Sequence, residues 1–224
     1  MNIRKDPLKN DYYYHIFSRS IAKFVVFNDA DDYSRFVEIL NLYHFVEFDY
    51  KYSQYNNLSE STKSQKLKKL TKSNLFWVEI VAFCVMPTHI HLILKQKIDG
   101  GISKYIGKVL NSYTRYFNLR HQRKGPLWEA RFKSVLVDSD EQILHLTRYI
   151  HLNPTSAGLV KNTSDWHFSS YHEYIQTNRK DHICIFKEVI DYSPEQYRKF
   201  VLDRKSYQRE ISLIKNSLID DYTG

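Results

Sequence analysis

Cysteine is scarce in this chain, and long apolar runs are missing from it. Only Cys84 and Cys184 occur among 224 residues, far apart in the sequence, so the chain lacks the dense disulfide framework of small secreted proteins. No apolar run approaches the roughly 20 residues that span a bilayer, and the first residues lack the apolar core of a signal peptide. These absences favour a cytoplasmic protein with no membrane partner.

Acidic residues are also in deficit. The chain has 33 Lys and Arg against 25 Asp and Glu, a net charge of +8 and a pI of about 9.2, which indicates an anionic partner, most commonly a nucleic acid. Across Lys104–Lys133 the only acid is Glu129, and aromatic residues are interleaved with the basic ones. This composition is typical of grooves that follow a single strand by contacting phosphates and stacking on bases. A solvated basic face is the alternative. The candidate DNA contacts are Lys104, Lys108, Arg115, Arg120, Arg123, Lys124, Arg131 and Lys133.

Hydrophobic residues make up 42% of the chain, enough for one domain with an elaboration or for two small domains. Runs of aromatic and β-branched residues predict strands, and apolar residues at helical spacing predict helices. The predicted strands are Tyr12–Arg19, Phe76–Val85, Ile90–Leu94 and Leu127–Val137; the predicted helices are Asp31–His44, Ser103–Leu119, Ser139–Leu152 and one starting near Ser193 within Asp191–Arg204. We expect Lys205–Gly224 to continue as a helix.

The segment Glu47–Asn74 differs in composition from its surroundings. Tyr, Ser, Asn and Lys dominate it, and lysines crowd together at Lys63, Lys66, Lys68, Lys69 and Lys72. Because its apolar periodicity is weak, we expect a mobile, solvated insertion that is mainly loop, with a short helix at Ser64–Leu70. A basic arm that touches phosphates is the alternative.

Two histidines, His89 and His91, stand one residue apart directly after a break at Pro87 and Thr88. Successive side chains of a strand point to opposite faces, so both imidazoles share one face and Ile90 lies on the other. Their Cα atoms would be roughly 7 Å apart, close enough for both rings to bind one cation. Packed structural histidines with hydrogen-bond partners are the alternative interpretation.

Three further polar residues give weaker signals. Tyr149 and Asn153 are four residues apart, so they project from the same side if the helix persists. Pro154 disfavours helical geometry at the preceding residue and therefore places Asn153 at the helix end. Taken alone, Tyr149 is typical of a packed or surface tyrosine and Asn153 of a helix cap. His15, in the first predicted strand, is expected to be structural.

Several stretches occur together in an order that points to one protein family. They read M-P-T-H-I-H-L-I-L at Met86–Leu94, G-P-L-W-E-A-R-F-K-S at Gly125–Ser134 and R-Y-I-H-L-N-P-T-S-A-G-L-V at Arg148–Val160, with Y-H-I-F-S-R at Tyr14–Arg19 and D-W-H-F-S-S-Y at Asp165–Tyr171. The chain thereby resembles the REP-associated tyrosine transposases, a branch of the single-tyrosine HUH transposases, over about residues 12–172. It departs from their pattern in its longer Lys-rich insertion and in Glu129-Ala130, where the family more often has Gln-Gly.

The resemblance implies an α+β fold, in which helices pack on a ferredoxin-like central antiparallel sheet. Residues 1–172 would form the HUH transposase domain, with the insertion at 47–74, and residues 173–224 would form a C-terminal helical extension.

The resemblance also implies a chemistry. His89, His91 and Asn153 would bind a divalent metal, Mg²⁺ or Mn²⁺, and Tyr149 would be the nucleophile. The implied reaction is cleavage and transfer of single-stranded, hairpin-forming DNA through a 5′-phosphotyrosine link. The enzyme would act in the cytoplasm, associated with the nucleoid when bound to DNA, as a monomer or a homodimer with its active site formed in cis or in trans.

Two rival functions stay open. One is a catalytically silent DNA-binding protein derived from such a transposase. The other is a metal hydrolase in which His89 and His91 activate water and Tyr149 is structural. The sequence offers no convincing additional carboxylate base, which favours the tyrosine as the nucleophile.

Overall fold

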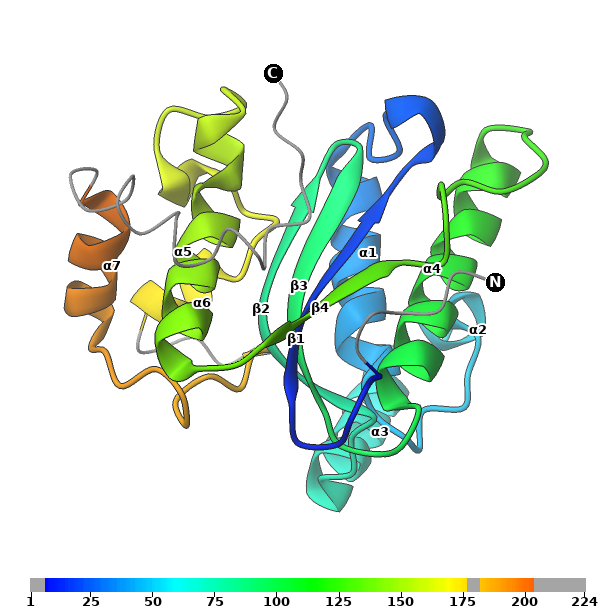
Figure 1. The fold of residues 1–224 in the computed structure, drawn as a ribbon. Helices are drawn as coiled ribbons and strands as arrows, with labels where there is room; N and C mark the ends of the chain where they lie inside the picture. The colour runs from blue at the N-terminus through cyan, green and yellow to red at the C-terminus, as the bar shows by residue number, and fades with distance from the viewer. Residues whose placement is uncertain (1–6, 177–181, 204–224) are drawn as a thin grey trace.

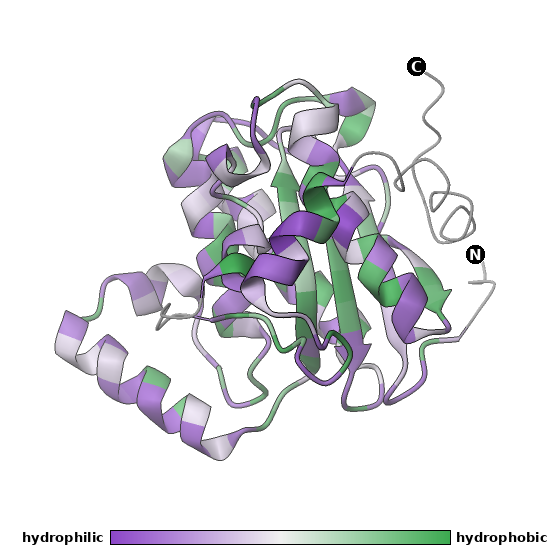
Figure 2. Cartoon of the chain, turned by 90° about the vertical axis from the view of Figure 1, so that its left-hand side faces the viewer, coloured by the Kyte–Doolittle hydropathy of each residue, from purple (hydrophilic) through white to green (hydrophobic). Residues whose placement is uncertain are grey.

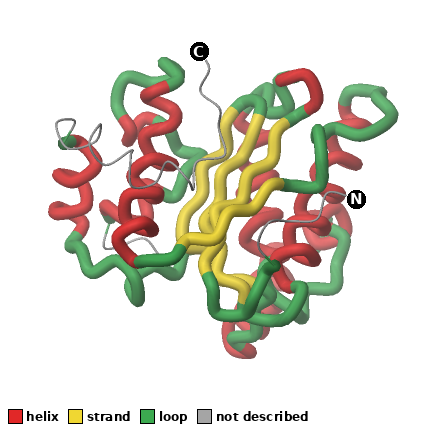
Figure 3. The backbone as a smooth tube through the Cα atoms, in the orientation of Figure 1, coloured by secondary structure: helices red, strands yellow, loops and turns green. Residues whose placement is uncertain are grey.

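A four-stranded antiparallel sheet forms the centre of the computed structural model, which describes residues 7–176 and 182–203 (Figure 3). Its strands lie in the order β2-β3-β1-β4, with bounds β1 Tyr13–Arg19, β2 Val78–Met86, β3 His89–Gln96 and β4 Lys133–Val137. This order is ferredoxin-like, because the connection from β1 to β2 and the connection from β3 to β4 each pack one long helix on the same face of the sheet. The α+β prediction is therefore confirmed.

The central hairpin forms as predicted. Pro87 and Thr88 make a two-residue connection between β2 and β3, and Met86 pairs with His89 across it. β3 is an inner strand, because β1 pairs with its other edge. The predicted strand Leu127–Val137 is shorter than expected, since β4 starts only at Lys133.

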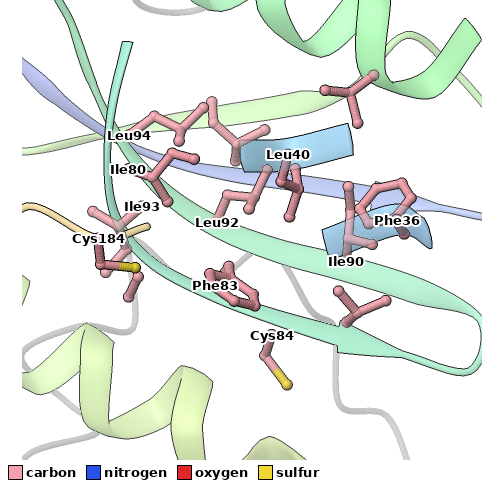
Figure 4. Packing of buried hydrophobic residues seen from close by; sticks show 14 of the residues in the cluster. Phe36, Leu40, Ile80, Phe83, Cys84, Ile90, Leu92, Ile93, Leu94 and Cys184 are labelled. Atoms are coloured by element: carbon pink, nitrogen blue, oxygen red, sulfur yellow. The ribbon is translucent and has the colours of Figure 1, made fainter. Parts of the chain in front are cut away.

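Two long helices cover one face of the sheet: α1 (Ala30–Tyr43) and α4 (Gly101–Arg120) (Figure 1). Both were predicted, and Asp29 caps α1 by accepting a hydrogen bond from the Asp32 backbone N–H. Figure 4 shows Phe36 and Leu40 of α1 against side chains of β3 in a continuous apolar core.

The opposite face is covered by α5 (Asp140–Ser156), and α6 (Tyr171–Ile175) and α7 (Pro194–Leu202) lie on the same side (Figure 1). Short 3₁₀ turns occur at Ile21–Lys23 and Thr163–Asp165. α7 begins near Ser193, as predicted; Ser193 caps the helix and Pro194 is its first residue. The helix predicted at Lys205–Gly224 lies outside the described residues, and the proposed domain boundary after residue 172 falls within α6.

The prediction of a mainly looped insertion at Glu47–Asn74 is wrong. The segment contains α2 (Tyr52–Asn56) and α3 (Glu60–Ser73), the second twice as long as the short helix expected at Ser64–Leu70. In Figure 2, which colours the chain by hydropathy, α3 is mostly purple or white while the strands are green.

A side-chain cap and two leucines hold α3 in place. The Ser59 side chain accepts a hydrogen bond from the Thr62 backbone N–H and so caps α3. Leu70 is buried, and Leu67 packs partly buried against the core. The remaining positions of α3 are dominated by Lys, Ser and Thr, and straight-chain lysines favour helix without giving an apolar period.

The helix end predicted at Asn153 is also wrong. α5 continues through Pro154 to Ser156, and the Ala157 backbone N–H still donates to the Asn153 carbonyl. Proline so close to the end of a helix removes one hydrogen bond but leaves the last turn closed by later residues.

Among the described residues, no helix combines the length and the apolar character needed to cross a membrane.

Burial of His44 makes the fold acid-sensitive. Its ring packs against Phe45 and Phe76, and burial lowers its pKa to about 3 by disfavouring the charged form. This pKa lies below the ordinary value of about 6.5. Between about pH 6.5 and pH 3 the unfolded chain therefore binds a proton at His44 that the folded protein does not bind. The free energy of unfolding should thus be independent of this residue above pH 6.5 and should fall as the pH drops toward 3.

We predict that His44→Phe flattens the pH dependence of the unfolding free energy. Between pH 6.5 and 5 the wild type should lose about 1.5 kcal/mol more than the variant, measured by urea denaturation at each pH. The exposed His167 provides the control, since His167→Gln should keep the wild-type profile. Parallel profiles for wild type and His44→Phe would contradict the prediction.

Candidate active site

The face of the sheet under α5 carries the two histidines that the sequence singled out. His89 and His91 share this face as predicted, with ring centroids 5.1 Å apart. In the register of β1 and β3, Phe17 lies opposite His91 and Arg19 opposite His89. The Phe17 ring is 5.0 Å from the His91 ring and 5.6 Å from the His89 ring. It therefore packs against both imidazoles.

Hydrogen bonds orient each imidazole. Nδ1 of His91 lies 3.0 Å from Nε2 of His15, and both side chains are fully buried. Nδ1 of His89 lies 2.9 Å from the Thr88 hydroxyl oxygen. In both histidines Nδ1 is engaged by the protein, so a ligand bound at Nε2 would meet a ring whose rotation is already restricted.

Helix α5 brings the two remaining candidates to the same place. The Tyr149 ring is 5.8 Å from the His91 ring and nearly perpendicular to it. Asn153, one turn later, has its amide nitrogen 3.4 Å from His91 Nε2. Both side chains are buried, and both contact His91 of their own chain. The i, i+4 arrangement expected from the sequence is present because α5 stays helical through Pro154.

The polar atoms here fit a cation with a mixed donor set. Oδ1 of Asn153 is buried and has no hydrogen-bond partner among the described residues, which is unusual for a buried amide oxygen. No group of three or more His, Cys, Asp and Glu side chains that could hold a metal occurs in the described part of the chain. A metal held by His89 and His91 would thus take Asn153 as its third protein ligand. Two imidazoles and an amide oxygen suit Mn²⁺, and also Zn²⁺, Ni²⁺ or Co²⁺.

A buried hydrogen-bond network fixes α5 from its other side. His151 Nδ1 is 2.7 Å from the Tyr197 hydroxyl on α7, and His151 Nε2 is 2.7 Å from the Ser170 hydroxyl. The Tyr197 hydroxyl also contacts Thr147 at 2.9 Å, and Ser170 reaches the Phe83 carbonyl of β2 at 3.2 Å. Burial lowers the pKa of His151 to about 3, so the ring is neutral and can donate one hydrogen bond and accept another.

The predicted DNA contacts do not lie together around the histidines. Lys104, Lys108 and Arg115 are exposed on α4, which covers the opposite face of the sheet (Figure 1). The ammonium groups of Lys104 and Lys108 lie 4.7 and 5.7 Å from the centroid of the Trp77 ring. The two lysines therefore lie over an aromatic side chain and not beside the candidate active site.

The remaining predicted contacts differ in their surroundings. Arg120 forms ion pairs with Asp29 at 2.6 Å and Asp32 at 2.7 Å, and Arg123 donates to the Asn118 side chain and the Pro126 carbonyl. Lys124, Arg131 and Lys133 are exposed. Lys133 on β4 lies opposite Phe17 in the register of β1 and β4. Because paired residues project to the same face, Lys133 shares the histidine face.

Sequence reasoning missed two residues of the site, Arg19 and His15. Arg19 is half-buried, lies opposite His89, and has its guanidinium carbon 5.2 Å from the Phe17 ring centroid. His15 contacts His91 directly. Alternation along β1 puts His15, Phe17 and Arg19 on one face, and this pattern was readable in the sequence. The pairing of β1 with β3 was not.

Comparison with known proteins identifies similar sequences. A family model described as "Transposase IS200 like" matches residues 40–153, a span that contains both histidines, Tyr149 and Asn153. A putative REP-associated tyrosine transposase of Haemophilus influenzae is 31% identical over 108 residues, which cover 44% of this chain and 61% of that protein. The REP-associated tyrosine transposase of Escherichia coli is 30% identical over 95 residues, which cover 42% of this chain and 54% of that protein. The matched regions thus span less than two thirds of either relative.

A solved structure is similar over a longer span. It is a REP-associated tyrosine transposase bound to a REP hairpin, with a TM-score of 0.51 and 19% sequence identity. The match covers 87% of this chain and 96% of the other. At this identity the match supports the fold.

The network behind α5 gives a stability prediction. Tyr197→Phe removes the hydroxyl shared by His151 and Thr147 and leaves buried polar atoms without that partner. We expect a loss of about 1–3 kcal/mol in unfolding free energy, measured by urea denaturation. Tyr192→Phe, at a more exposed tyrosine of the same region, should be within about 0.5 kcal/mol of the wild type. Equal losses in the two variants would show that the buried hydroxyl has no special role.

Proposed function

Because the chain belongs to the IS200-like transposase family, we propose that it is a metal-dependent endonuclease and strand transferase of single-stranded, hairpin-forming DNA. The observation that carries the proposal is the position of the Tyr149 ring beside His91 of the same chain. His89 and Asn153 lie beside His91 in the same cluster. The cluster thus sets a phenol, which can act as a nucleophile, beside two imidazoles and an amide oxygen that can bind a metal.

In the proposed reaction, Tyr149 Oη attacks the phosphorus of a DNA phosphodiester. A phenol with a pKa of about 10 is a weak nucleophile at neutral pH, so it must lose its proton to solvent as the bond forms. The bond from phosphorus to the 3′ oxygen breaks, and that oxygen takes up a proton to become a free 3′-OH. The other product is a 5′-phosphotyrosine link. Attack on this link by another 3′-OH rejoins DNA strands and restores the phenol.

His89, His91 and Asn153 would hold a divalent cation, Mg²⁺ or Mn²⁺. Bound there, the cation would neutralise charge on the scissile phosphate and stabilise the leaving oxygen. The protein restricts the rotation of both imidazoles through His15 and Thr88. It also fixes the helix that carries Tyr149, so little ordering remains to be done when the substrate binds.

The DNA would approach from the histidine face. Arg19, opposite His89, and Lys133, opposite Phe17, share this face in the strand register, and their charges favour phosphate groups. Arg131, two residues before β4 begins at Lys133, is also exposed and would extend this basic surface along the β4 edge of the sheet. We propose that this surface, in the cytoplasm, accommodates a hairpin and its adjoining single strand.

We predict that Tyr149→Phe abolishes a covalent protein–DNA adduct. The test is incubation with Mg²⁺ or Mn²⁺ and a labelled single-stranded hairpin substrate, followed by a denaturing gel. Tyr192→Phe, far from the histidines in sequence and exposed, should form the adduct normally. DNA binding with no cleavage by the wild type would favour a silent DNA-binding protein. Cleavage without an adduct, unaffected by Tyr149→Phe, would favour a metal hydrolase.

We predict that His89→Ala abolishes cleavage with little loss of DNA affinity, because the metal site acts on the reacting phosphate while the basic residues hold the rest of the DNA. Cleavage and binding would be measured on the same labelled hairpin. A large loss of affinity with retained cutting would overturn this assignment.

Formation of the site within one chain gives a further prediction. We propose that Tyr149 serves the histidines of its own chain, beside which it lies. A mixture of His91→Ala and Tyr149→Phe chains should then stay inactive, because neither chain carries both groups. Restored adduct formation in the mixture would instead indicate an active site shared between two copies.

A further inference from the structure

We propose that His15 is a positioning residue that determines which nitrogen of His91 is presented to the metal. The inference rests on the proposed function, because it concerns the same metal site. Its basis is the 3.0 Å contact between His15 Nε2 and His91 Nδ1, made by two side chains that are both fully buried.

A contact of this length between two neutral imidazoles is a hydrogen bond in which one nitrogen carries the proton and the other accepts it. Two arrangements are possible. If His15 Nε2 donates, His91 has its proton on Nε2, and that nitrogen has no lone pair for a cation. If His15 Nε2 accepts, His91 has its proton on Nδ1, and Nε2 carries a lone pair.

The position of Asn153 selects between the two arrangements. Its amide group approaches His91 at Nε2, at 3.4 Å, so Nε2 is the nitrogen on the side of the proposed ligand set. Only the second arrangement lets this nitrogen bind a cation. We therefore assign His15 the role of acceptor, with its own proton on Nδ1.

The rings are also held in place by stacking. The planes of His15 and His91 are inclined by 17° with centroids 5.3 Å apart, and Phe17 packs against His91 at 5.0 Å. β1 and β3 are paired from Tyr13 to Arg19, so the backbones that carry His15 and His91 cannot separate without breaking the ladder. A partner fixed in this way restricts both the ring rotation and the tautomer of a metal ligand.

Two substitutions separate this role from simple packing. His15→Phe keeps a planar ring and removes the acceptor. His15→Gln can place an amide oxygen close to the position of Nε2 and so retains an acceptor. We expect His15→Phe to weaken Mn²⁺ binding about tenfold or more, measured by calorimetry without DNA, and His15→Gln to retain most of the affinity. The exposed His167→Phe should bind Mn²⁺ as the wild type does.

A second readout does not depend on metal or activity. Nitrogen NMR of ¹⁵N-labelled, metal-free wild type should show His91 protonated at Nδ1 and His15 protonated at Nδ1. In His15→Phe the His91 tautomers should become mixed. A wild-type His91 protonated at Nε2, or a His15→Phe variant that binds Mn²⁺ as tightly as the wild type, would overturn the proposal.

These outcomes are distinct from failure of the proposed function. If the wild type neither bound Mn²⁺ nor formed the Tyr149 adduct, the nuclease would be refuted, and with it the metal-presenting role of His15. If the wild type formed the adduct while His91 was protonated at Nε2, only the role of His15 would be refuted. Should His15→Phe fail to fold, the wild-type tautomers and the His15→Gln affinity still decide the question.

Discussion

The candidate site depends on one packing contact, that of α5 against the face of β3 that carries His91. The phenol of Tyr149 and the amide of Asn153 come from a helix, and the imidazoles come from a strand. The four groups therefore meet only because α5 crosses β3 at the level of His91. The network through His151, Tyr197 and Ser170 holds the opposite side of α5. Rigid support of this kind limits how far the reacting groups can drift from one another.

Much of this arrangement could be predicted from local sequence. The apolar pattern of β2 and β3, broken at Pro87 and Thr88, places both imidazoles on one face without knowledge of any other element. Helical spacing likewise relates Tyr149 to Asn153. Motifs shared with the transposase family then joined the strand to the helix, which spacing alone could not do.

The remaining features depend on tertiary contacts. The contribution of His15 and Arg19 follows from the pairing of β1 with β3, and one sequence gives no register between strands that are separated by more than 60 residues. α3 was missed because two leucines anchor a helix that is otherwise polar. Pro154 was expected to end α5, but a proline near a helix end costs only one backbone hydrogen bond.

The inner position of β3 constrains how such a chain can vary. Because β3 is paired on both edges, insertion of one residue within it would turn the side chains beyond that point to the other face. The segment between α1 and β2 is under no such restriction, and it accommodates two additional helices. Related chains should therefore accumulate length changes there, while the spacing between the two imidazoles stays fixed at a single intervening residue.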